Sequence, residues 1–148
     1  MNVLSLEELK DRGAIYIKDI LFGFDNYKSE ILTLSEQEAE EFFKEMWIDS
    51  GKKNCYVDFY YFTLNDEARK IVEKELTKEE IVFLQGIKPE ETDKIYFEFD
   101  QALLKIVVKL NAREILFSTF YFVNNKSTWW GNYNKEYVKF SQNEFKEK

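Results

Sequence analysis

The chain has 148 residues, enough for a domain with a sizeable core, and 45% of them are hydrophobic. Its formal net charge of −7 disfavours nonspecific binding to nucleic acids or anionic membranes and suits a basic partner. With no histidine and a single cysteine, Cys55, the chain cannot form an internal disulfide, a Cys-based zinc site or a histidine-activated nucleophile. We therefore expect no metal and no cofactor, and we expect Cys55 to pack as a small apolar residue.

The N-terminal residues lack a basic stretch followed by an apolar run, and no run of about 18 apolar residues occurs. These features predict neither a signal peptide nor a membrane span. We expect a cytoplasmic protein, and the richness in Lys, Asn, Ile and Phe favours a bacterial or phage source.

The N-terminal third of the chain carries two capping boxes. Ser5-x-x-Glu8 predicts a helix that stops at Gly13, and Ser35-x-x-Glu38 predicts a longer helix that reaches about residue 49. The segments 14–22 and 30–34 between and around these helices are predicted to be strands.

The middle of the chain alternates helix and strand signals. Apolar residues alternate with polar ones around 56–61 and 94–99, which is typical of half-buried strands. Helices are predicted from Asn65 or Asp66 to about Leu76 and from Thr77 to Gly86, where a Schellman motif should end the second helix. The segment 101–110 fits a helix capped by Asp100 but alternates well enough to be a strand, and we prefer the helix. Residues 115–123 are apolar on both faces and predict a central strand.

These elements predict one α+β domain over residues 1–148: a largely antiparallel sheet with helices packed mainly on one face. Scarce Gly and Pro agree with short connections between the elements.

The segment 127–137, STWWGNYNKEY, predicts a hairpin. If Asn134 and Lys135 form a two-residue turn, Trp129 opposes Phe140 on an apolar face, and Gly131 leaves a gap there for a side chain or a ligand ring. The opposite face would then carry the candidate partner-binding residues Trp130, Asn132, Tyr137 and Lys139. We leave open whether that face is exposed or covered.

Two further groups of residues could carry a function. Asp58 and Glu98 lie on the polar sides of two predicted strands among tyrosines, and a pair of carboxylates is what glycoside hydrolysis uses. The predicted helix 35–49 is strongly acidic, and Glu38, Glu41 and Glu45 could meet a basic partner, although a solvated face is the ordinary role of such residues.

No sequence motif indicates a phosphate, dinucleotide or calcium site, and we expect no catalysis. In being small, acidic, aromatic-rich and free of histidine, the chain resembles bacterial immunity proteins and antitoxins, a resemblance of composition and not of motif. It implies a small interaction module that binds a basic protein. The alternative is a small-ligand or carbohydrate-binding module with a hydrolytic Asp58–Glu98 pair. A concave aromatic pocket would favour the alternative, and a flat acidic surface would favour the interaction module. Nucleic-acid binding is disfavoured, and a homodimer stays open.

Overall fold

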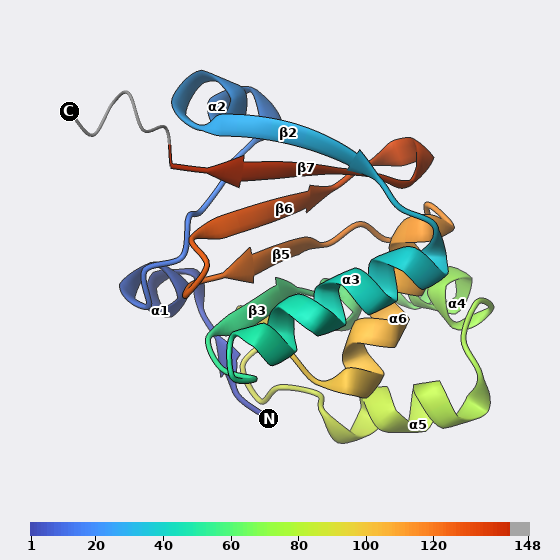
Figure 1. Cartoon of the computed structure of the whole chain (residues 1–148). Coiled ribbons are helices and arrows are strands. Elements are labelled where there is room, and N and C mark those ends of the chain that lie inside the picture. The colour runs from blue at the N-terminus through green and yellow to red at the C-terminus, as the bar shows by residue number, and fades with distance from the viewer. Residues whose placement is uncertain (143–148) are drawn as a thin grey trace.

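The computed structural model describes residues 1–142, which form an antiparallel sheet with helices on both faces and the longer ones on one face (Figure 1). In this part of the chain the sheet has seven strands, in the order β1-β4-β3-β5-β6-β7-β2. The strands are β1 (Val3–Leu4), β2 (Lys28–Thr33), β3 (Cys55–Asp58), β4 (Tyr96–Glu98), β5 (Thr119–Phe122), β6 (Ser127–Gly131) and β7 (Glu136–Ser141). The helices are α1 (Leu6–Asp11), α2 (Ile20–Asn26), α3 (Glu36–Asp49), α4 (Asp66–Glu73), α5 (Lys78–Gly86) and α6 (Gln101–Ala112). The predicted α+β class is confirmed.

The capping signals in the sequence are confirmed. The side chains of Ser5, Ser35 and Thr77 each accept a hydrogen bond from the backbone N–H of the glutamate three residues on. The carboxylate of that glutamate accepts a hydrogen bond from the backbone N–H of the capping residue. Asn65 caps α4 and Asp100 caps α6, so 101–110 is a helix and not a strand. Local hydrogen bonding at helix N-termini is what the sequence predicts most directly.

Several boundaries differ from the prediction. The helix α4 ends at Glu73 and not near Leu76, and β3 ends at Asp58, with a 3-10 turn over Tyr61–Thr63. Residues 14–22 form no strand, because Asp19 accepts a hydrogen bond from Phe22 N–H at 2.8 Å and caps α2 there. The strand predicted over 115–123 is shorter, since β5 begins only at Thr119. Gly86 belongs to the last turn of α5 and does not have the positive φ of a Schellman glycine; Ile87 at φ −108° caps the helix.

The main core lies on the sheet face that α3 and α6 cross, here called the α3/α6 face (Figure 1). Its sheet side chains include Val57, Phe97, Phe120 and Trp129. The Phe43 ring of α3 stacks on Phe120 with centroids 4.3 Å apart. Burial of large rings contributes strongly to stability, because each removes a large apolar area from water.

The opposite face of the sheet is here called the tyrosine face, after Tyr56, Tyr96 and Tyr121. Its covering is lighter: α1 packs Leu9 onto these tyrosines, and the segment 14–26 packs onto β7. Gly23 of α2 allows close approach there, since a Cβ at this position would lie 2.5 Å from the Phe140 ring. Within residues 1–142, none of the helices combines the length and apolar character that a membrane span requires.

Candidate functional site: the Asp58 cleft

The β6–β7 hairpin has a different register from the predicted one. Its loop is three residues long, Tyr133–Lys135, and Trp129 pairs with Lys139, Trp130 with Val138 and Gly131 with Tyr137. Both Asn134 (φ 61°) and Lys135 (φ 59°) adopt the left-handed conformation. The backbone N–H of Asn134 donates to Oε2 of Glu114 at 2.8 Å, so a residue distant in sequence holds the loop.

This slip of one residue moves the β7 side chains to the opposite faces from those predicted. Tyr137 is buried on the α3/α6 face, and Lys139 places its Nζ 5.6 Å from the centroid of the Trp129 ring, not of the Trp130 ring. The predicted surface of Trp130, Asn132, Tyr137 and Lys139 therefore does not exist as one face. Trp130 and Asn132 remain together, and Tyr137 and Lys139 lie on the other side of the sheet.

Trp129 is a core residue as predicted, 3% exposed and packed edge-on against Phe42 and Phe43. The gap predicted at Gly131 is present and is filled by Asn111 of α6. A Cβ at position 131 would lie 2.1 Å from Oδ1 of Asn111 and 2.7 Å from the carbonyl oxygen of Ser118. No ligand ring could enter on that side.

Asp58 and Glu98 lie on neighbouring strands, as the carboxylate-pair hypothesis required. Asp58 pairs with Tyr96 and Glu98 pairs with Tyr56, which places both carboxylates on the tyrosine face as diagonal neighbours. Their surroundings differ: Asp58 is 6% exposed, whereas Glu98 is partly exposed.

A cleft of about 270 Å³ opens beside Asp58 at the end of the sheet where β3 finishes and β5 begins. It is lined by Asp58, Tyr60, Phe117, Ser118, Thr119, Trp130, Gly131, Asn132 and Tyr133. We refer to it as the Asp58 cleft. The cleft brings Asp58, from the predicted carboxylate pair, together with Trp130 and Asn132, from the predicted partner-binding residues. Glu98 is not part of its lining.

The carboxylate of Asp58 is fixed by a hydrogen bond from β5. The backbone N–H of Thr119 donates to its Oδ1 at 2.8 Å. Burial raises the pKa of Asp58 from about 3.8 to about 7, and the hydrogen bonds from Thr119 lower it only in part. Nearby, burial followed by the Asp58 charge raises the pKa of Tyr60 to about 12. Asp58 is thus a carboxyl group that changes charge near neutral pH.

Ser118 supplies a second polar group, a hydroxyl that lacks a hydrogen-bond partner among the described residues. Its backbone N–H donates to Asn111 Oδ1 at 3.2 Å and its carbonyl accepts from Gly131 N–H at 3.1 Å. Its hydroxyl is buried and has no hydrogen-bond partner among the described residues. Buried polar atoms are normally paired, so an unpaired one at a cleft wall marks a place for a ligand or a water molecule.

Part of this site was not predicted. Phe117, Ser118 and Thr119 lie in the segment 115–123 that predicts a central strand, and Tyr133 is not among the candidate partner-binding residues of the hairpin. Their meeting with Asp58 depends on where β5 starts and on the three-residue loop, and neither has a local signal. Of the remaining candidates, Cys55 is buried, and burial raises the pKa of its thiol to about 11, which leaves no reactive thiolate at neutral pH.

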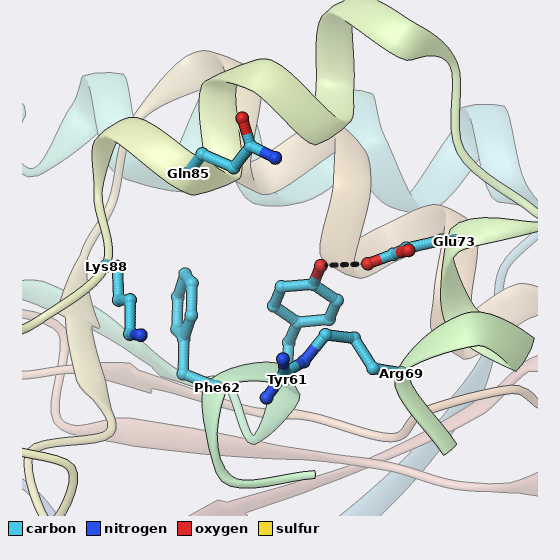
Figure 2. A pocket seen from close by; sticks show the side chains of 6 residues that line it. All are labelled: Tyr61, Phe62, Arg69, Glu73, Gln85 and Lys88. Carbon is cyan, nitrogen blue, oxygen red and sulfur yellow. Dashed lines mark hydrogen bonds between the residues drawn. The ribbon is translucent and has the colours of Figure 1, made fainter. Parts of the chain in front are cut away.

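A second hollow, of about 210 Å³, lies between α4, α5 and the turn Tyr61–Thr63 and is drawn in Figure 2. Two of its charged side chains, Arg69 and Glu73, already have partners. The Tyr61 hydroxyl donates a hydrogen bond to Glu73 at 2.5 Å, and the Arg69 guanidinium lies over the Tyr61 ring (Figure 2). Nη2 of Arg69 donates to the carbonyl oxygen of Leu64 at 2.9 Å. The Nε of Arg69 is buried without a partner. Because Glu73 and part of the Arg69 guanidinium already have partners, this hollow is the weaker candidate.

The acidic helix is as exposed as predicted. Glu38, Glu41 and Glu45 are all exposed and share one side of α3. The carboxylate of Glu38 accepts a hydrogen bond from Ser35 N–H at 2.9 Å, and this bond lowers the pKa of Glu38. At least one member of the stripe therefore has a structural task in the helix cap.

Comparison with protein-family models, with curated protein sequences and with solved structures found no match for this chain. The function of the chain therefore has to be inferred from the site itself. Within residues 1–142, no three residues able to ligate a metal come together.

Proposed function

We propose that this chain is a small-ligand-binding protein whose ligand occupies the Asp58 cleft. The observation that carries the proposal is that one cleft is lined by four aromatic residues, the buried Asp58 and Ser118, whose buried hydroxyl has no partner among the described residues. Concave sites with apolar walls and a few fixed polar groups are typical of small-molecule binding. Small-ligand binding is the alternative to a protein-interaction module that the sequence suggested.

Support for a hydrolytic site is weaker, because the cleft contains one carboxylate. Glycoside hydrolysis by two carboxylates needs both groups to flank the same scissile bond. Glu98 faces the same side of the sheet as Asp58 but lies outside the cleft lining. The geometry therefore favours binding over catalysis.

A fluorescence screen of a small-molecule library tests the proposal. Trp130 lines the cleft, so a bound ligand should change the emission of the wild-type chain and leave the Trp130→Phe variant unchanged. Trp47→Phe is the matched control, since Trp47 packs against the main core and is not in the cleft lining. Hits that respond equally in Trp130→Phe would place the ligand elsewhere, and a screen without Trp130-dependent hits would contradict the proposal.

A second candidate function is the binding of a basic protein by α3. It is favoured by the exposed stripe Glu38, Glu41 and Glu45, among which no carboxylate forms an ion pair with another described residue. Charge on such a surface mainly accelerates association and selects the partner. Affinity capture from a bacterial lysate with the wild-type chain and with Glu41→Lys/Glu45→Lys tests it. A basic protein captured only by the wild type would support it, and identical capture by both would count against it.

A further inference from the structure

The Asp58 cleft has a negative group and no positive one. None of its lining residues is Lys or Arg, and among the described residues none forms an ion pair with Asp58. The carboxylate is 6% exposed and accepts one backbone hydrogen bond. A buried carboxylate is costly unless a proton, a cation or further hydrogen bonds compensate it, so a cation beside Asp58 would stabilise its charged form.

The rings of the cleft are likewise free of cations. Five aromatic rings of the described chain have a Lys or Arg over them, those of Tyr16, Phe22, Trp47, Tyr61 and Trp129. None of the four rings that line the cleft is among these five. The faces of Trp, Tyr and Phe rings attract cations, most strongly when the cation is removed from water.

We propose that the ligand of the Asp58 cleft is an organic ammonium cation, with Asp58 as its counter-charge and Tyr60, Phe117, Trp130 and Tyr133 as the rings around it. This inference depends on the proposed function and specifies the chemical class of the ligand. A neutral sugar could stack on the same rings and hydrogen-bond Ser118, but it would leave the carboxylate without a positive partner. The net charge of −7 would also attract a cation toward the protein.

Calorimetric titration with three named probes tests the ligand class. The probes are choline, its neutral isostere 3,3-dimethylbutan-1-ol, and methyl β-glucopyranoside, measured in sodium chloride so that simple ions compete. Choline should bind about tenfold or more tightly than the isostere, because both can contact the rings but only the cation gains the ion pair and the cation–π attraction. Asp58→Asn, which keeps the oxygen that Thr119 N–H bonds, should abolish this preference. Glu98→Gln is the matched control on the same face and should retain it.

The outcomes separate the inference from the function on which it depends. Equal binding of choline and its isostere, or binding of the glucoside alone, would overturn the ammonium inference and leave small-ligand binding in place. A preference for choline that survives in Asp58→Asn would also overturn it. If Asp58→Asn folded poorly, amide and side-chain NMR shifts of the wild type on addition of choline would decide: shifts at Trp130 and Thr119 support the inference, and shifts confined to other residues contradict it. Failure of all three probes overturns the inference, whereas the proposed function falls only if the Trp130-dependent screen also finds no ligand.

Discussion

The two faces of the sheet are built by the same strands and differ in chemistry and in cover. On the α3/α6 face, Phe and Trp side chains pack under two helices of 14 and 12 residues. On the tyrosine face, Tyr56, Tyr96 and Tyr121 add hydroxyl groups, and Asp58 lies among them. The cover there is α1, with 6 residues, and α2, with 7.

The difference locates the candidate site. None of the residues lining the Asp58 cleft comes from α1 or α2, so the cleft lies where the short cover of the tyrosine face ends. A buried carboxylate and an unpaired hydroxyl cost stability, and the apolar α3/α6 face supplies the stability that offsets them. We therefore expect substitutions on the first face to lower stability, and we expect substitutions in the cleft to alter binding and, at Asp58, to raise stability.

The largest expected loss of stability comes from Trp129→Ala. This side chain is 3% exposed and contacts Phe42 and Phe43, so its removal should lower the free energy of unfolding by about 3–5 kcal/mol. Trp130→Ala is the comparison from the other face, and we expect a loss of about 1 kcal/mol because this ring is only partly buried. Urea denaturation of both variants measures the difference, and equal losses would contradict the contrast between the faces.

Asp58→Asn should stabilise the chain, and the gain should depend on pH. The pKa of Asp58 is about 7 in the folded state against an ordinary 3.8, so between these values the folded state binds more protons than the unfolded state. The free energy of unfolding of the wild type therefore falls as the pH rises from about 4 to about 7. Asn cannot ionise, so the variant should gain little at pH 4 and on the order of 4 kcal/mol at pH 8.

Denaturation of Asp58→Asn and the wild type at both pH values checks this expectation. The tyrosines around Asp58 have pKa values raised above 10, so they do not titrate in this range. Glu98 is the carboxyl group diagonal to Asp58 on the same face, and Glu98→Gln is the control against which the trend of Asp58→Asn is compared. A gain that is constant from pH 4 to pH 8 would mean that Asp58 does not ionise with a raised pKa.

Gly131→Ala should have an intermediate effect, a loss of about 1–3 kcal/mol. The added methyl group would lie 2.1 Å from Oδ1 of Asn111, which is itself held by hydrogen bonds to Val107 and Ser118 and cannot withdraw freely. Gly86→Ala is the matched control: nothing lies within 4 Å of its added Cβ, and Ala favours the helix. Thermal melts should show opposite signs for the two variants, and a neutral Gly131→Ala would refute the close packing of Asn111.

What the sequence predicted well was determined locally. The capping boxes at Ser5, Ser35 and Thr77 involve residues three apart, and alternation placed Asp58 and Glu98 on the same sides of their strands as tyrosines. What it missed was determined by contacts between distant segments. The hydrogen bond from Asn134 to Glu114 sets the hairpin loop, and burial of Asp58 depends on where β5 begins.

The smallest effect, and the most direct test of the hairpin register, concerns Lys139. Its ammonium group lies over the Trp129 ring, so Lys139→Met, which keeps much of the apolar stem, should lower the free energy of unfolding by about 0.5–1 kcal/mol. Two double-mutant cycles locate the interaction, one with Trp129→Leu and one with Trp130→Leu. In the observed register, Lys139 should couple to Trp129 and not to Trp130, because Trp130 faces the cleft on the other side of the sheet. Coupling to Trp130 alone would instead indicate the two-residue turn predicted from the sequence, with Lys139 on the tyrosine face. That face would then have its own cation, and the Asp58 cleft would no longer need one from a ligand.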